Sequence, residues 1–145
     1  MKLPATSMEN KVLSDTCGRK AIMWDVIEIK GEQVVRLTFL SVNSRWRQGV
    51  WLRSDPGITI HGEMHHSLQL WQDNSPSVVE MMVSAEDGRL HVYNIWDSHR
   101  GYGRESQSHT SGMLIEQTGN VRTYQCHDIG TTPDFSKLVF SLELE

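Results

Sequence analysis

Hydrophobic and polar residues alternate with a period of two along most of the chain from Ile22 onward, and Gly, Asn, Asp or Pro interrupt this alternation at short intervals. This pattern is typical of an antiparallel all-β fold, and no segment shows a convincing amphipathic helix. The clearest predicted strands are Ile22–Ile29, Val34–Val42, Trp46–Arg53, Val78–Ser84, Arg89–Trp96, Met113–Gln117, Val121–Cys126 and Leu138–Leu144, with shorter ones at Ile58–His61 and Ser67–Trp71.

The connections between these strands predict how they are arranged. Segments such as 31–33, 85–88 and 118–120 contain residues that favour tight turns, which join antiparallel neighbours. The connections at 97–110 and 128–136 are longer and could carry the chain from one sheet to another. We therefore expect a single-domain antiparallel β-sandwich, partly jelly-roll-like, or a flattened β-barrel of about nine strands.

The alternation also predicts which side chains face the core. One face of the second strand carries Val35, Leu37 and Phe39, and the last strand has a similar apolar stripe at Leu138, Phe140, Leu142 and Leu144. The strand Arg89–Trp96 carries apolar or amphipathic side chains on both faces. We expect that strand to be central, with its second face either covered or used for binding.

The length and composition suit one domain. With 145 residues, of which 38% are apolar, the chain can bury a core without disulfides or a structural metal. It divides into a polar N-terminal arm, residues 1–20, and an all-β domain, residues 21–145. The arm lacks the apolar run of a secretory signal, and no segment has the length and hydrophobicity of a membrane span. Cys17 and Cys126 are predicted to be unpaired thiols of a cytoplasmic protein.

The overall charge is mildly acidic. Fourteen Lys and Arg against eighteen Asp and Glu give a net charge of -4, which argues against nucleic acid or an anionic membrane as a partner. Five of the fourteen cations, however, belong to two short segments: Arg45, Arg47, Arg53, Arg100 and Arg104. This local enrichment is compatible with a small anionic ligand.

The first candidate site is the long segment 97–112, which contains Arg100, Tyr102 and Arg104. Long loops in compact domains are often functional, and Gly101 and Gly103 would let the backbone approach a ligand closely. Guanidinium groups suit a carboxylate, a phosphate or an acidic sugar. The alternative is a solvated loop whose serines bond their own backbone.

The second candidate site lies on a strand. In the segment 44–53, alternation places Arg47, Trp51 and Arg53 on one face, and His91 and Tyr93 show comparable spacing in a later strand. Arginine beside aromatic rings is typical of a surface that binds saccharides or other polar ligands. The alternative is that the arginines lie over a tryptophan that shields the core.

A third candidate is a metal site at His61, Glu63 and His65, which would share one face of an extended segment. Imidazole and carboxylate groups are suitable transition-metal ligands. The segment partly resembles the first metal motif of the cupins, but Glu63 stands between the histidines and no second cupin motif is evident. Gly62-Glu63 could equally form a hairpin turn that separates the histidines. No other cofactor is indicated.

Four blocks, S-R-W-R-Q-G-V-W-L-R, L-W-Q-D, Y-N-I-W-D and D-F-S-K-L-V-F, carry a resemblance that extends over residues 22–145. They are similar to blocks of an uncharacterised family of small bacterial single-domain proteins with no known activity. The resemblance implies a bacterial, single-domain protein and brings no ligand or catalytic residue.

These observations lead to three functional hypotheses. The first is a non-catalytic domain that binds a small polar ligand, anionic or saccharide, through Arg47, Trp51, Arg53, His91, Tyr93, Arg100, Tyr102 and Arg104. The second is a metal-dependent enzyme on a cupin-like β-scaffold. The third is a protein-interaction or inhibitor module. Whether the protein is an enzyme stays open at this level.

Overall fold

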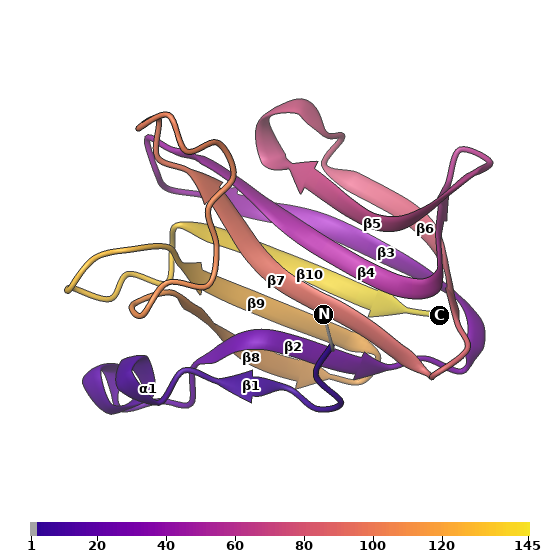
Figure 1. Ribbon diagram of the computed structural model, residues 1–145, viewed down its shortest axis with the longest axis horizontal. Helices are drawn as coiled ribbons and strands as arrows, with labels where there is room; N and C mark the ends of the chain where they lie inside the picture. Colours follow the sequence, from indigo (N-terminus) through magenta and orange to yellow (C-terminus); the bar gives the residue numbers. More distant parts are fainter. Residues whose placement is uncertain (1–2) are drawn as a thin grey trace.

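The computed structural model describes residues 3–145, and most of these residues lie in β-strands (Figure 1). The predicted all-β class is therefore confirmed. The elements, in chain order, are β1 (Met8–Glu9), α1 (Lys11–Cys17), β2 (Ile22–Glu28), β3 (Gly31–Val42), β4 (Arg47–Ile60), β5 (Glu63–Trp71), the short 3-10 helix η1 (Gln72–Asn74), β6 (Val78–Ala85), β7 (Arg89–Asp97), β8 (Gly112–Thr118), β9 (Val121–His127) and β10 (Leu138–Leu144).

Eight strands close into an antiparallel barrel, so the structure adopts the barrel rather than the open sandwich. Their order is β2-β7-β4-β6-β3-β10-β9-β8, and β2 closes the ring by pairing with β8. This closing contact consists of one residue pair, Ile22 with Met113. The remaining two strands lie outside the ring, β1 against β2 and β5 against β4.

The two ends of the barrel differ in their connections. Tight turns, including those after β2, β6 and β8, lie at the right-hand end of Figure 1, whereas the segments 43–46, 98–111 and 128–137 gather at the left-hand end. The two longest connections match the predicted ones. The segment 98–111 passes the end of β2 to reach β8, and the Gln107 amide donates to the Met23 carbonyl oxygen at 2.7 Å.

Strand β4 joins two sides of the barrel. The sequence pattern predicts two strands here, but the structure has one, which pairs with β7 from Arg47 to Arg53 and with β6 from Pro56 to Thr59. Its pairing with β5 shifts in register between Arg53 and Ile58. The turn-forming segment 54–57 therefore bends the strand instead of ending it, because neighbouring strands supply backbone partners on both sides of the bend.

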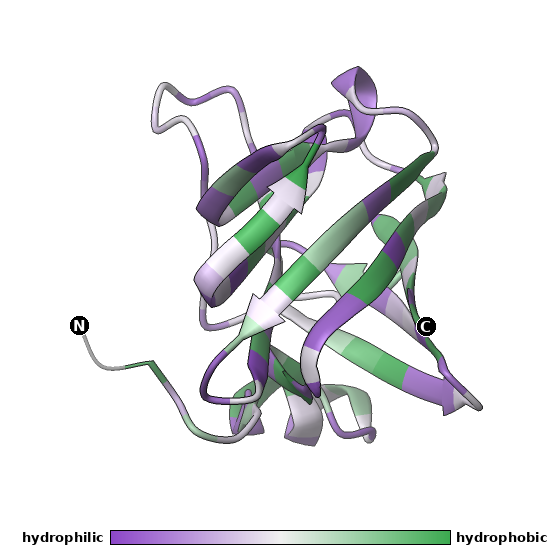
Figure 2. Ribbon diagram, turned by 90° about the vertical axis from the view of Figure 1, so that its right-hand side faces the viewer, coloured by the Kyte–Doolittle hydropathy of each residue, from purple (hydrophilic) through white to green (hydrophobic). Residues whose placement is uncertain are grey.

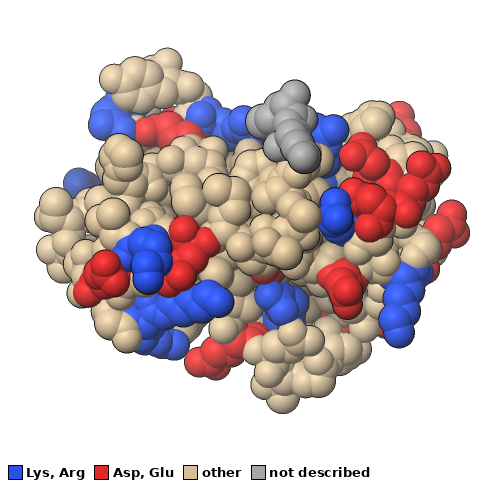
Figure 3. All heavy atoms as spheres, turned by 60° about the horizontal axis from the view of Figure 1, so that its bottom comes forward, with Lys and Arg blue, Asp and Glu red and all other residues tan. Residues whose placement is uncertain are grey.

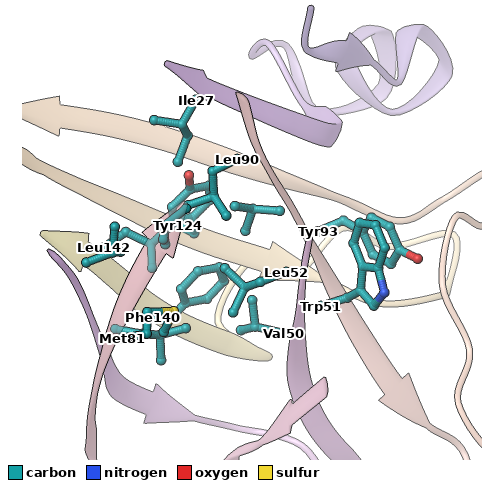
Figure 4. Close-up of a cluster of buried hydrophobic side chains, with 14 of the residues drawn as sticks. Ile27, Val50, Trp51, Leu52, Met81, Leu90, Tyr93, Tyr124, Phe140 and Leu142 are labelled. Atoms are coloured by element: carbon teal, nitrogen blue, oxygen red, sulfur yellow. The ribbon is translucent and has the colours of Figure 1, made fainter. Parts of the chain in front are cut away.

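The barrel interior is filled with side chains. The predicted stripes are confirmed, because Val35, Leu37, Leu138, Phe140 and Leu142 are fully buried. In Figure 4 the Tyr124 and Phe140 rings lie together among aliphatic side chains, with ring centroids 4.5 Å apart. Figure 2 shows the hydrophobic and hydrophilic residues alternating along the strands. Because side chains fill the interior, we look for a ligand site on the outside of the barrel.

The hydrophobic pattern misses helix α1, as well as the two-residue strand β1 and the short helix η1. The Asn10 side chain caps the first turn of α1 by accepting from the Leu13 N–H, and Gly18 ends this helix in the left-handed conformation. Leu13 packs on Ala21 and Leu114. Seven residues are too few for a helical period to stand out, so the helix is specified by its two caps and one buried contact.

Candidate functional site

Aromatic rings gather on the outer face of β2, β7 and β4. Trp51 and Tyr93 are paired across β4 and β7, and their rings stack with centroids 4.4 Å apart and planes 16° apart. Figure 4 shows this stack on its own, away from Tyr124 and Phe140. Trp24 and His91 complete the group, which we call the outer aromatic cluster.

Trp24 contacts each of the other three rings of this cluster. Its ring meets Trp51 at 5.3 Å, Tyr93 at 5.0 Å and His91 at 5.9 Å between centroids. Its indole Nε1 donates a hydrogen bond to His91 Nδ1 at 3.0 Å. Trp51, Tyr93 and His91 are only 7%, 6% and 1% exposed, whereas Trp24 is partly exposed. The ring that solvent and ligands can reach is therefore Trp24, not the predicted Trp51.

Charged groups surround the buried imidazole of His91. Burial lowers its pKa, and the nearby cations Arg53 and Arg89 lower it further, while Asp87 and Asp55 act in the opposite direction. A neutral imidazole whose Nδ1 accepts a hydrogen bond carries its proton on Nε2. His91 thus lies as a neutral group between two arginines.

Arg53 and Arg89, the two arginines next to His91, lack a direct carboxylate hydrogen bond. The closest contact between Arg53 and Asp55 is 3.7 Å, and that between Arg89 and Asp87 is 3.8 Å. Both distances exceed the 2.7–3.2 Å that a charged N–H···O hydrogen bond requires. The guanidinium groups, about one-third exposed or more, can therefore donate to an incoming anion.

A hollow of about 630 Å³ adjoins these residues, within the usual size range of small-molecule sites. Its walls are the N-terminal segment 5–7 on one side and β2 with the β6–β7 turn on the other. Val26, the cross-strand partner of His91, and Arg89 both line it. The hollow thus begins beside the outer aromatic cluster.

Arg104 lies at the other end of the cluster. Burial raises the pKa of the Tyr93 hydroxyl, and Arg104 and Ser106 oppose that rise through charge and hydrogen bonding. Arg104 makes no ion pair with the carboxylates of residues 3–145. The structure therefore brings five predicted ligand residues together: Trp51, Arg53, His91, Tyr93 and Arg104.

Arg47 is the first predicted ligand residue that lies apart. Its guanidinium makes two hydrogen bonds to Asp73, at 2.8 and 2.9 Å, and lies 4.4 Å from the centroid of the Trp71 ring. The hydrogen bond to Asp73 raises the pKa of Arg47, and the same bond lowers that of Asp73. This bidentate pair fastens η1 to β4 and leaves Arg47 little capacity for a ligand.

Arg100 and Tyr102 also lie apart from the cluster, on the segment 98–111. Arg100 donates to Glu105 at 2.7 Å and to the Ser98 hydroxyl at 2.7 Å, so its charge is satisfied within the loop. Partial burial alone would raise the pKa of Glu105, but hydrogen bonds from Ser98 and Arg100 hold it below its usual value. Tyr102 is 70% exposed. These hydrogen bonds join residues of the loop to one another.

The predicted metal residues do not form a metal site. His61 stands at the β4–β5 turn with a positive φ of 51°, and Glu63 and His65 are separated by 3.8 Å between their closest charged atoms. Within residues 3–145, no group of three His, Cys, Asp or Glu side chains is arranged to hold a metal ion. The segment does form a hairpin turn, but at His61–Gly62, one residue before the predicted Gly62-Glu63, and Glu63 is the first residue of β5.

A buried ionic network is the main feature that the sequence analysis did not find. Asp25 is 1% exposed and accepts hydrogen bonds from Ser7, from the Tyr124 hydroxyl at 2.5 Å and from Arg122 at 3.0 and 3.1 Å. Burial raises the pKa of Tyr124 well above its usual value. Every oxygen of Asp25 is thus occupied by this network, which joins β2 to β9 beside the sparsely paired β2–β8 contact.

Basic and acidic groups are mixed on the face of the molecule that Figure 3 shows. On the face drawn in Figure 3, Lys and Arg atoms are interspersed with Asp and Glu atoms, and acidic atoms crowd toward the right-hand edge.

Cys17 and Cys126 are unpaired, as predicted. No helix among residues 3–145 has the length and apolar character needed to cross a membrane. In comparisons with known proteins, no family model, curated protein or solved structure matches this chain.

Proposed function

We propose that this protein is a recognition domain for a small sugar acid, which it binds on the outer face of β2, β7 and β4. The observation that carries the proposal is the placement of Arg53 and Arg89, which lack direct carboxylate hydrogen bonds, next to His91, the hydrogen-bond partner of the partly exposed Trp24. Arg89 also lines the hollow of about 630 Å³. Of the other arginines considered as ligand residues, Arg47 and Arg100 are already hydrogen-bonded to carboxylates.

The chemistry of a sugar acid matches both parts of this surface. The C–H face of a pyranose ring can pack on the indole of Trp24, as sugars do on aromatic side chains. Its carboxylate can accept hydrogen bonds from Arg53 or Arg89 in place of the long contacts to Asp55 and Asp87. Arg104, near Tyr93, adds a further positive charge.

Titration with glucuronate, followed by tryptophan fluorescence and amide chemical shifts, tests the proposal. We expect glucuronate to bind more tightly than glucose, because only the former has a carboxylate. Substitutions Arg53→Gln and Arg89→Gln should each weaken glucuronate binding by about tenfold, the effect of losing one charged hydrogen bond.

Arg19→Gln is the matched control, because Arg19 also has only a long contact, 3.7 Å, to a carboxylate but belongs to the connection between α1 and β2. It should leave the affinity unchanged. Equal binding of glucose and glucuronate, or equal losses in all three variants, would contradict the proposal.

The cellular setting that we propose is the cytoplasm of a bacterium. Supporting the compartment are the two unpaired cysteines, since thiols stay reduced in a cytoplasm. Fractionation of cells that express the full chain, with immunodetection in each fraction, is the direct test. Recovery in the periplasmic or secreted fraction would contradict the proposal.

A further inference from the structure

The hydrogen bond between Trp24 and His91 lies directly beneath the proposed ligand surface. Trp24 Nε1 can only donate, and it donates to His91 Nδ1 at 3.0 Å. The two rings are almost perpendicular, at 82°, so the imidazole edge meets the indole edge that carries the N–H. His91 is 1% exposed, and its position on β7 is set by pairing with Val26 on one side and Arg53 on the other.

The contacts of Trp24 show why this bond matters. Its remaining contacts within the cluster are with the rings of Trp51 and Tyr93, which are apolar and allow an indole to slide or tilt. A hydrogen bond depends more steeply on direction than a contact between rings does. The bond to His91 is therefore the interaction that fixes the orientation of the partly exposed indole.

We infer that His91 is a positioning residue, which holds the Trp24 indole in the orientation that a sugar ring would contact. This inference rests on the proposed function for its ligand, whereas the orientation of Trp24 is a property of the free protein. Protonation of His91 would place a hydrogen on Nδ1, opposite the indole N–H, and two donors cannot bond to each other. The indole would then lose its partner.

The charges around His91 decide when this loss occurs. Arg53 on β4 and Arg89 on β7 oppose protonation, as does burial beneath Trp24 of β2, while Asp55 and Asp87 favour it. The net effect lowers the pKa of His91 below the ordinary histidine value. Trp24 should thus keep its partner at neutral pH and lose it in acid.

Two variants separate positioning from simple packing. His91→Gln keeps a side-chain acceptor for the indole N–H, whereas His91→Leu keeps a buried apolar group without an acceptor. His109, which is exposed on the segment 98–111, provides the control His109→Gln. The indole N–H signal of Trp24 in ¹H–¹⁵N spectra, assigned by its absence from Trp24→Phe, reports the bond in the full chain without any ligand.

We expect slow solvent exchange of this indole proton in the wild type and in His91→Gln, and at least tenfold faster exchange in His91→Leu. Acidification should abolish the protection in the wild type but not in His91→Gln. Glucuronate affinity should fall at least fivefold in His91→Leu and stay within twofold of wild type in His91→Gln and His109→Gln.

Fast solvent exchange of the Trp24 indole proton in the wild type would overturn the inference. An exchange rate in His91→Leu equal to that of the wild type would also overturn it. The same holds if His91→Gln loses as much affinity as His91→Leu. If the wild type binds no glucuronate although the indole proton behaves as expected, the proposed function fails and the control of Trp24 by His91 stands.

Discussion

At the scale of single residues, Asp25 is the most heavily bonded side chain of the barrel. Ser7, Arg122 and Tyr124 all donate to its carboxylate. The substitution Asp25→Ala leaves the half-buried Arg122 charge unpaired, and we expect it to lower the free energy of unfolding by about 3–5 kcal/mol. Urea denaturation measures this loss.

Glu80 supplies the control for Asp25. It pairs with Arg36 at 3.0 Å on the surface, with 62% of its side chain exposed. Exposed ion pairs contribute little, so Glu80→Ala should cost about 1 kcal/mol or less. A similar small cost for Asp25→Ala would show that the buried network adds no stability.

His91 gives stability a pH dependence. Because its pKa is lowered in the folded protein, the unfolded chain binds the proton more tightly, and stability falls as pH drops. The contribution is fully present above the ordinary histidine pKa of about 6.5 and is lost progressively below it. We expect His91→Gln to reduce the stability difference between pH 7.5 and pH 5.5 by about 1 kcal/mol, measured by denaturation at both pH values.

At the scale of elements, the Glu105 carboxylate is one of the groups that hold the segment 98–111 in place, together with the Gln107 amide, which donates to Met23. Glu105 accepts from Ser98 and Arg100, and its backbone exchanges two hydrogen bonds with Trp96. Glu105→Gln removes the charge that these donors share. We expect faster amide exchange at Trp96 and Glu105 positions, and earlier protease cleavage within the loop, with little change in β9 and β10. An equally protected loop in the variant would show that the backbone pairing alone suffices.

Strand β4 packs too closely for a side chain at Gly49. A Cβ there would lie 2.7 Å from the Leu70 carbonyl oxygen, 3.1 Å from the Trp71 ring and 3.2 Å from Ile95. Gly49→Ala must therefore push β5 or β7 away, and we expect a loss of about 1–3 kcal/mol in the free energy of unfolding. Thermal and urea denaturation measure it, with the exposed Ser67→Ala on β5 as control. If Gly49→Ala leaves the free energy of unfolding unchanged, β5 can move to make room for the Cβ without a loss of stability.

At the scale of the whole molecule, the barrel is unevenly closed. The β2–β8 contact has a single residue pair, whereas β9 pairs with β10 over six residues and with β8 over seven. We expect amides at the β2–β8 contact to exchange by local opening, well before those of β9 and β10, in native-state hydrogen exchange. Simultaneous exchange of all these strands would show that the side-chain network of Asp25 closes the barrel as firmly as backbone pairing does.

Much of the fold could be predicted from the sequence because the patterns that specify strands extend over only a few residues. The alternation at Val35 and Leu37, and the stripe from Leu138 to Leu142, place the core correctly, since a strand turns every second side chain to the same face. The same rule places Arg53 and Trp51 on one face. Helix α1 could not be found in this way because its signal lies in caps, at Asn10 and Gly18, and not in a period.

The sequence by itself determined the all-β class, the main strands and the two long connections, because periodicity and turn chemistry act over a few residues. Only the tertiary structure decided which arginines are already hydrogen-bonded to carboxylates. Arg47 bonds to Asp73, which is 26 positions away in the sequence. Arg89, by contrast, is two positions from Asp87 but approaches it no closer than 3.8 Å, too far for a hydrogen bond. The tertiary structure also decided that Trp24 covers Trp51, because β2 reaches β4 only through the intervening β7. Exposure and charge pairing depend on contacts between distant segments, and strand order is what creates those contacts.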